Sequence, residues 1–136
     1  MNRTLEHILP RVQKPARYTG GEYNAVVKDR RAVDVRYALC FPDTYEIGMS
    51  NLGVRILYGL MNEMDGVWCE RVFAPWGDME EEMRREGIPL YGLDRCHFKS
   101  LFRSQSKLYR AFYIVINMSL SPYLFNVFII CTKAES

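Results

Sequence analysis

The sequence is poor in the residues from which metal centres are built. It holds two histidines and four cysteines among 136 residues. His7 and His97 have no companion ligand at metal-binding spacing, so we expect both to be surface residues. No two cysteines have the close spacing of a zinc knuckle or a redox motif. These absences argue against a zinc site and against dithiol chemistry.

Other common signatures are missing as well. The sequence has no Ser/His/Asp set, no Walker loop and no Gly-x-Gly-x-x-Gly fingerprint. Its net charge is only +2, which argues against a nucleic-acid-binding protein with a basic stripe. Residues 1–6 do not resemble a secretion signal, and Cys40 and Cys69 lie in apolar runs that favour buried free thiols. We therefore expect a reduced, cytoplasmic protein.

The composition that remains is that of a globular protein, with 49% hydrophobic and 25% charged residues. The charge is unevenly distributed, because residues 1–95 carry a net −2 and residues 96–136 a net +4. We therefore divide the chain into an N-terminal extension at 1–32, a central domain at 33–95 and a divergent tail at 96–136. A length of 136 residues leaves little room for a second domain.

Strand-like and helix-like patterns alternate in the central domain. The pattern predicts a strand at 33–41, a loop at 43–49, a helix at 50–64, a strand at 67–74, a helix at 78–86 and a third strand at 88–91. Ser50 or Asn51 is the expected N-cap of the first helix, which Asp65 and Gly66 end. The apolar stripe expected to face the core consists of Leu52, Ile56, Leu57, Leu60, Met61 and Met64.

This order predicts an α/β fold with right-handed connections and a parallel sheet. Three strands and two helices make an incomplete three-layer, Rossmann-like domain. In the extension, residues 4–9 predict one or two helical turns before Pro10. Residues 23–28 predict a short strand that pairs as a hairpin with the strand after it.

The tail contains 22 residues without a charge, at 111–132. This length suffices to cross a bilayer, although Pro122 and several polar side chains interrupt the run. Three interpretations stay open. The run is a membrane helix, or it forms buried strands or helices broken at Ser121 and Pro122, or the whole tail is the non-native product of a truncation or frameshift.

Three stretches of the sequence, at 14–24, 38–53 and 70–79, resemble a family of large radical SAM enzymes. The resemblance extends from about Lys14 to about Leu93 and matches the N-terminal, cobalamin-binding-like domain of that family. It implies a Rossmann-like domain placed ahead of a catalytic barrel, so a barrel domain or another chain is the expected partner. It also implies that the [4Fe–4S] cluster and SAM belong to that barrel.

This sequence lacks the Cys-x-x-x-Cys-x-x-Cys loop that holds such a cluster. We therefore expect this chain alone to be inactive.

The loop from Asp43 to Gly48 is the candidate cofactor site. Cobalamin domains of the methionine-synthase type carry Asp-x-His-x-x-Gly here, and the histidine binds cobalt. Tyr45 stands at the histidine position, and a neutral phenol is a poor cobalt ligand. If cobalamin binds, we expect it to bind without a histidine on its lower face. The candidate cofactor-binding residues are Asp43, Thr44, Tyr45, Glu46, Gly48, Ser50 and Asn51.

Two other interpretations of this loop stay open. It is purely structural, with an Asx-turn at Asp43, a positive φ at Gly48 and a helix cap at Ser50, or it binds another ligand at the sheet edge. For the whole chain, the alternatives are a cofactor-binding module of a radical SAM protein and a non-catalytic remnant or interaction domain. We expect Lys14 and Arg17 to be solvated or to make contacts within the domain, and a contact with a partner domain is the alternative. We expect Glu80, Glu81 and Glu82 to form a solvated helix face.

Overall fold

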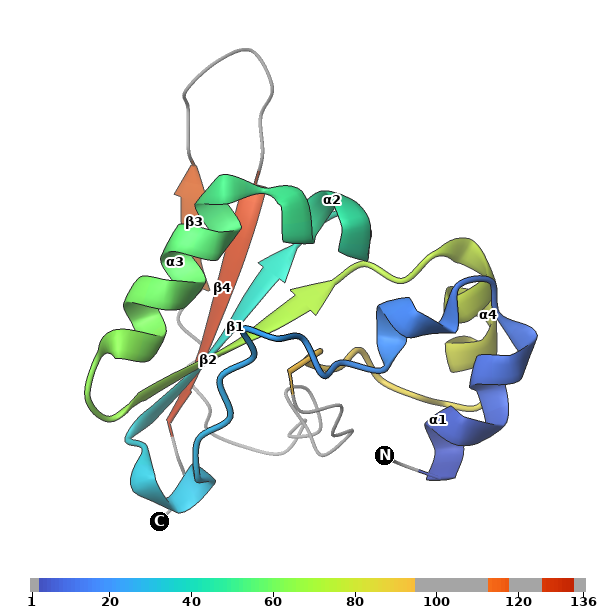
Figure 1. Ribbon diagram of the computed structural model, residues 1–136, viewed down its shortest axis with the longest axis horizontal. Helices are drawn as coiled ribbons and strands as arrows, with labels where there is room; N and C mark the ends of the chain where they lie inside the picture. Colours follow the sequence, from blue (N-terminus) through green and yellow to red (C-terminus); the bar gives the residue numbers. More distant parts are fainter. Residues whose placement is uncertain (1–2, 95–112, 118–125, 134–136) are drawn as a thin grey trace.

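The computed structural model describes residues 3–94, 113–117 and 126–133 (Figure 1). The elements, in chain order, are α1 (Arg3–Ile8), the 3₁₀ turns η1 (Leu9–Arg11), η2 (Pro15–Tyr18) and η3 (Arg30–Ala32), β1 (Val35–Phe41), α2 (Tyr45–Ser50), α3 (Leu52–Glu63), β2 (Val67–Phe73), α4 (Gly77–Arg85), β3 (Tyr113–Asn117) and β4 (Asn126–Lys133).

The strands form one sheet with the order β2-β1-β4-β3. β1 and β2 are parallel and in register from Val35 opposite Val67 to Phe41 opposite Phe73. β4 runs antiparallel to both β1 and β3. The predicted α/β arrangement of strand, helix and parallel strand is confirmed for β1, α3 and β2. The sheet as a whole is mixed, because β4 and β3, on the other side of β1, are joined to it by antiparallel pairing.

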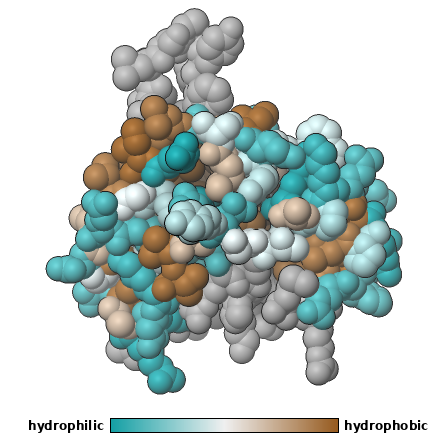
Figure 2. All heavy atoms as spheres, in the orientation of Figure 1, coloured by the Kyte–Doolittle hydropathy of each residue, from teal (hydrophilic) through white to brown (hydrophobic). Residues whose placement is uncertain are grey.

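α3 covers one face of the sheet, but the side of the helix that faces the sheet is not the predicted apolar stripe. Its buried residues are Val54, Tyr58 and Asn62, and the core beneath it contains Leu39 and Cys69. Of the predicted stripe, only Leu57 and Met61 pack against this core, whereas Leu52, Ile56, Leu60 and Met64 are exposed (Figure 2). The prediction of a helix was correct, and the prediction of its buried face was largely wrong.

The third strand predicted at 88–91 does not form. Residues 88–91 have no strand structure, although Leu90 packs against Ala38 and Val72 on the sheet face opposite α3. The physical reason is that, at the outer edge of β2, side chains already form hydrogen bonds with the backbone N–H and C=O groups. Lys28 donates to the carbonyl of Val67, Asn62 bonds both backbone groups of Cys69, and Asp94 accepts from the N–H of Arg71. An edge occupied in this way cannot accept a full β ladder.

The strand predicted at 23–28 is also absent, and with it the hairpin. Residues 25–29 have no regular structure, because side chains bond their backbone. Tyr58 accepts from the N–H of Val26 at 2.7 Å, and Trp68 Nε1 donates to the carbonyl of Val26 at 3.0 Å. These two bonds hold the segment beside β2 without a ladder.

A second core lies beside the sheet, where α1 packs against α4 (Figure 1). Its residues are Leu5, Ile8, Leu9, Val12, Tyr18, Met79, Met83 and Ile88. The helical turns predicted at 4–9 and the helix predicted at 78–86 are confirmed within one residue. Gly87, at φ +63°, follows α4 as expected for a C-terminal glycine. The N-terminal extension therefore packs on the same helix that follows β2.

The part of the tail that the structure describes consists of β3 and β4. Their bounds place strands on either side of Ser121 and Pro122, in agreement with the strand interpretation, and they contradict a membrane helix over 111–132. Within residues 3–94, 113–117 and 126–133, no helix has the length and apolarity needed to cross a bilayer. Cys96 and His97 lie outside the described residues.

Candidate functional site

The parallel strands β1 and β2 end side by side, at Phe41 and Phe73. The chain leaves β1 into α2 and leaves β2 toward α4, so two connections diverge from the same edge of the sheet. A backbone bond from Ala74 N–H to the Asp43 carbonyl, at 2.9 Å, joins them. Ligands of open α/β sheets bind at this kind of edge. The candidate residues, from Asp43 to Asn51, lie where the chain leaves the carboxyl end of β1.

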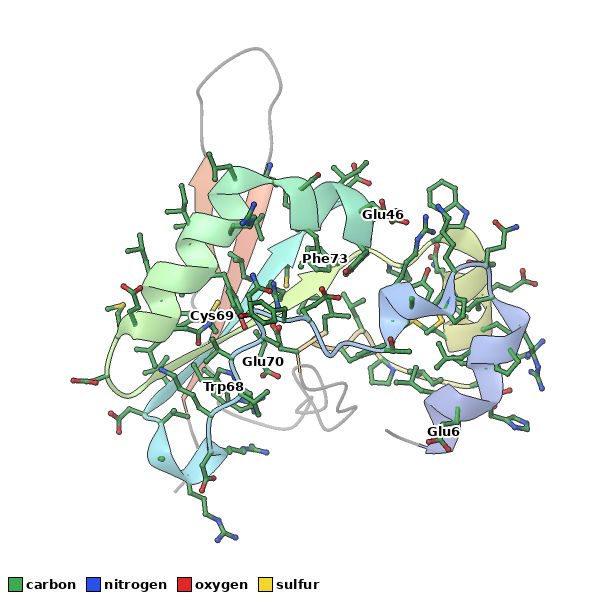
Figure 3. The ribbon with its side chains drawn as sticks, viewed as in Figure 1. Glu6, Glu46, Trp68, Cys69, Glu70 and Phe73 are labelled. Carbon is green, nitrogen blue, oxygen red and sulfur yellow. The ribbon has the colours of Figure 1, made fainter. Side chains whose placement is uncertain are left out.

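Residues 45–50 form a short helix, α2, where the sequence predicted a loop. Gly48 does not have a positive φ, so that interpretation of this glycine is wrong. A side chain at Gly48 would overlap the ring of Phe73 and would lie 3.2 Å from Phe41 Cδ1. Figure 3 shows Phe73 close to α2 at the end of β2. Gly48 therefore lets α2 lie directly on the ends of both strands.

Tyr45 points from α2 toward the N-terminal segment. Its hydroxyl donates to Glu22 Oε1 at 2.5 Å, and its ring meets Phe73 edge-on at 6.0 Å between centroids. Burial, reinforced by the bond to Glu22, raises the pKa of Tyr45 to about 12. Tyr45 is thus a neutral hydrogen-bond donor whose proton is already engaged.

Glu46 lies on the exposed side of α2. It accepts from Arg17 Nε at 2.7 Å, and Lys14 Nζ lies 3.5 Å from the same oxygen. The bond from Arg17 lowers the pKa of Glu46. The Arg17 guanidinium also stacks on Trp76, 5.5 Å from the ring centroid. Lys14 and Arg17 thus both contact Glu46, which agrees with the prediction of a solvated or intradomain role.

The other predicted site residues are bonded to nearby backbone. Asp43 accepts from the N–H of Thr44, and Thr44 precedes α2 without a side-chain cap. Ser50 donates to the carbonyl of Ile47, and Asn51 accepts from the N–H of Val54 at 3.0 Å. Asn51, rather than Ser50, therefore caps α3. Of the seven predicted residues, only Tyr45 and Glu46 direct functional groups toward other segments.

A small hollow lies between α2 and the connection after β2. Its lining residues are Arg17, Tyr18, Tyr45, Phe73, Ala74, Pro75, Met83, Leu90, Tyr91 and Leu93. Its volume is about 30 Å³, whereas pockets for drug-sized ligands occupy roughly 300–1,000 Å³. As the described residues shape it, the hollow accepts water or a group of a few atoms.

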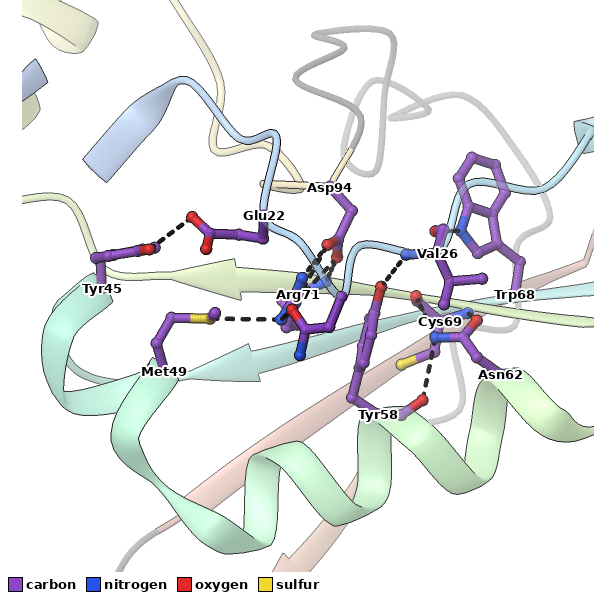
Figure 4. A network of polar contacts seen from close by, with 11 residues as sticks. Glu22, Val26, Tyr45, Met49, Tyr58, Asn62, Trp68, Cys69, Arg71 and Asp94 are labelled. Carbon is purple, nitrogen blue, oxygen red and sulfur yellow. Dashed lines mark hydrogen bonds and ion pairs between the residues drawn. The ribbon is translucent and has the colours of Figure 1, made fainter. Parts of the chain in front are cut away.

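A buried ion pair joins Arg71 on β2 to Asp94 (Figure 4). The side chain of Arg71 is 1% exposed and that of Asp94 is 0% exposed. Arg71 also donates to Asn24 at 3.2 Å, and its guanidinium lies 4.1 Å from the ring centroid of Tyr58. Burial opposes the charge of Arg71, but Asp94 outweighs it and raises the arginine pKa.

A second buried pair lies on the opposite face of the sheet. Arg36 on β1 donates to Glu70 on β2 at 2.5 Å, and its guanidinium lies 5.0 Å from the Trp68 ring centroid. Neither pair was predicted from the sequence. The signal was available, because Glu70 and Arg71 interrupt an otherwise apolar strand, and charges inside a buried strand need partners.

The described residues do not fit a metal centre or a corrinoid. No three of their histidine, cysteine, aspartate or glutamate side chains are grouped as metal ligands. Burial raises the pKa of the thiols of Cys40 and Cys69 to about 11 and about 12, so both stay protonated. For a corrinoid, Tyr45 offers no lower ligand and the hollow is too small. His7 is exposed, as predicted for a surface residue.

We expect Tyr45 to titrate near pH 12, two units above an unperturbed tyrosine. Because the folded pKa is the higher one, the stability that Tyr45 contributes is complete below pH 10 and is lost between pH 10 and 12. Glu22→Gln should lower the Tyr45 pKa but leave it above 10, since burial is the larger cause. Ultraviolet titration of the tyrosinate, corrected with Tyr45→Phe, measures this. A Tyr45 pKa at 10 would contradict the contact with Glu22.

Comparison with known proteins relates one part of the chain to a family. Residues 53–103 match the family model described as radical SAM proteins, N-terminal. The match begins within α3 and includes β2, α4 and the segment of Asp94. No curated protein and no solved structure matches this chain. The family match supports the resemblance to the N-terminal region of radical SAM proteins.

Proposed function

We propose that this chain is a non-catalytic N-terminal module of a radical SAM protein, and that the edge formed by α2 and the connection after β2 docks the part that carries the cluster. The observation that carries the proposal is the family match over residues 53–103. The α/β unit of β1, α3 and β2 is compatible with an incomplete Rossmann-like domain. When bound, the cluster and SAM would supply the radical chemistry in the other part.

The edge itself has the character of a protein contact. Its polar side chains are bonded internally, as the pairs of Tyr45 with Glu22 and of Glu46 with Arg17 illustrate. Its rim exposes apolar surface at Trp76, which is 52% exposed, and at Ile47. Arg17 and the backbone bond from Trp76 N–H to the Tyr18 hydroxyl hold this tryptophan in place. A fixed, half-exposed tryptophan is a common binding hot spot.

The first test reads the nucleotide sequence that follows the codon for Tyr91. We expect one reading frame to continue into a Cys-x-x-x-Cys-x-x-Cys segment. That polypeptide, produced separately, should bind this chain, and Trp76→Ala should weaken binding at least about tenfold. Glu80→Ala, an exposed change on α4, is the matched control and should leave binding unchanged. Absence of such a segment, or equal binding by Trp76→Ala, would contradict the proposal.

Corrinoid binding is the second candidate. The spacing of Asp43 and Gly48 at the end of β1 favours it, but the hollow beside α2 is too small for the ring and would have to open. Hydroxocobalamin mixed with the protein and separated by gel filtration tests it. Co-elution in near-stoichiometric amounts would support this second candidate, and the visible spectrum should then lack a histidine ligand on cobalt. A spectrum with a histidine ligand would contradict the assignment of Tyr45. Cytoplasmic location and the absence of nucleic-acid binding stay predictions.

A further inference from the structure

The outward face of α3 is apolar, although it borders no described element. Its exposed apolar residues are Leu52 at 65%, Ile56 at 50% and Leu60 at 56%, and Met64 follows just after the helix at 57%. Figure 2 shows apolar side chains gathered over this helix. Single exposed apolar residues are ordinary, but a continuous row on one helix marks an interaction surface.

The row has the geometry of a helix-packing ridge. Its members recur every four residues, so they form one of the i±4 ridges that interdigitate when two helices pack. Gly59 lies on the same outward side, one residue before Leu60, and nothing stands within 4 Å of the place where its side chain would be. A glycine beside a ridge allows a partner backbone to approach closely.

The charges beside the ridge are arranged symmetrically. Arg55 and Glu63 are both exposed, and each lies four residues from Gly59, in opposite directions along α3. Neither side chain forms an ion pair with another described residue, unlike the exposed Glu80, which pairs with Arg84. A helix with a positive charge and a negative charge equally spaced about its middle is complementary to itself in the antiparallel direction.

We propose that α3 is the interface with a second copy of this chain, in a two-fold dimer whose α3 helices run antiparallel and cross at Gly59. In this arrangement Arg55 faces the partner's Glu63, and Glu63 faces the partner's Arg55. The ridge of Leu52, Ile56 and Leu60 packs against its symmetry copy. A helix-to-helix contact of this kind is smaller than a standard interface of about 800 Å² per partner, so the dimer is weak and depends on concentration.

Sedimentation velocity over a range of protein concentrations tests the proposal. The full chain should shift from monomer to dimer as its concentration rises. Leu60→Asp should abolish the shift, while Val27→Asp, which changes an equally exposed residue off α3, should preserve it. Both changes are at exposed positions, so thermal unfolding should show the same transition as the unaltered chain. A monomer at all concentrations, or a dimer that Leu60→Asp leaves intact, would overturn the proposal.

Charge reversal tests the antiparallel geometry itself. Arg55→Glu alone, and Glu63→Arg alone, should each weaken dimerisation several-fold by placing like charges opposite each other. The double variant Arg55→Glu/Glu63→Arg should restore it, because the two reversed charges again face opposite charges. If the double variant dimerises as weakly as the single variants, the proposed pairing of Arg55 with the partner's Glu63 is wrong.

Two further outcomes separate this inference from the docking proposal. Leu60→Asp should leave binding of the cluster-carrying polypeptide unchanged, since that contact is placed at the edge near Trp76. If Leu60→Asp abolishes that binding and the chain alone stays monomeric, α3 binds the polypeptide and the dimer is refuted. If vesicles of anionic lipid capture the chain through α3 without dimerisation, the dimer is likewise refuted.

Discussion

Replacing Asp94 with alanine should lower the free energy of unfolding by about 3–5 kcal/mol, the cost of leaving a buried charge without its partner. Arg71 has no route to solvent to compensate, since its side chain is 1% exposed. The variant also removes the acceptor of the Arg71 N–H at the edge of β2. Urea unfolding at neutral pH measures the loss. It should be among the largest from any single change in the chain.

Two controls distinguish the cost of an unpaired buried charge from the cost of losing any ion pair. Glu80→Ala breaks the exposed pair with Arg84 and should change stability by no more than about 0.5 kcal/mol. Arg71→Met/Asp94→Asn removes both charges and keeps an acceptor for the N–H of position 71, so it should recover most of the loss. A double variant as unstable as Asp94→Ala would show that the ion pair is not the cause.

The outcome also bears on the family match. Asp94 lies inside the matched residues 53–103, which also contain β2, and it joins the stretch after α4 to β2 through a side chain rather than a strand ladder. Leu93 N–H donates to the Arg71 carbonyl at 2.7 Å, and this is the one backbone hydrogen bond between that stretch and β2 among the described residues. Two parts of the matched region, β2 and the stretch that ends at Asp94, are therefore held together by one buried carboxylate and one backbone bond.

The local patterns of the sequence were enough to predict the central elements. The apolar runs at 33–41 and 67–74 predicted β1 and β2 within a few residues, and Gly66 correctly marked the turn after α3. α2 was missed because six residues that include a glycine carry little helical signal. Its position depends on contact between Gly48 and Phe73, which are distant in sequence.

The position of the candidate residues after β1 could be predicted from the sequence, but their contacts could not. The apolar run of β1 itself marks where the strand ends, so Tyr45 and Glu46 could be placed after that end from the sequence. Their partners, Glu22 and Arg17, come from an irregular segment more than twenty residues earlier. Periodicity carries no information about such contacts. The third strand failed for a related reason, because side chains distant in sequence occupy the edge of β2.

α3 shows where an apolar pattern misleads. The helix has two rows of residues at four-residue spacing. The row of Val54, Tyr58 and Asn62 is buried, whereas the more hydrophobic row of Leu52, Ile56 and Leu60 is exposed. The buried row contains Tyr58 and Asn62, and both bond backbone groups outside α3. Asn62 Nδ2 donates to the Cys69 carbonyl at 3.0 Å, and its Oδ1 accepts from the Cys69 N–H at 2.9 Å. Hydrogen bonding, rather than hydrophobicity, therefore decides the orientation of α3.

Asn62→Leu should consequently lower the free energy of unfolding by about 2–4 kcal/mol, although leucine has a similar volume and is more hydrophobic. The reason is that both backbone groups of Cys69 lose their partner, at about 1–3 kcal/mol for each buried group. Asn51→Leu is the matched control, because this asparagine caps the same helix through one bond and its loss should cost about 1 kcal/mol. Urea unfolding of the two variants gives the comparison.

If hydrophobicity oriented α3, Asn62→Leu would be as stable as the unaltered chain or more stable, and the polar account would be wrong. If hydrogen bonding orients it, the loss is accompanied by faster hydrogen exchange at the Cys69 amide, which no longer has an acceptor. The exposed row of Leu52, Ile56 and Leu60 then faces outward because hydrogen bonds to β2 fix the opposite side of α3. An apolar surface can persist on a helix when two hydrogen bonds on the opposite side fix its rotation.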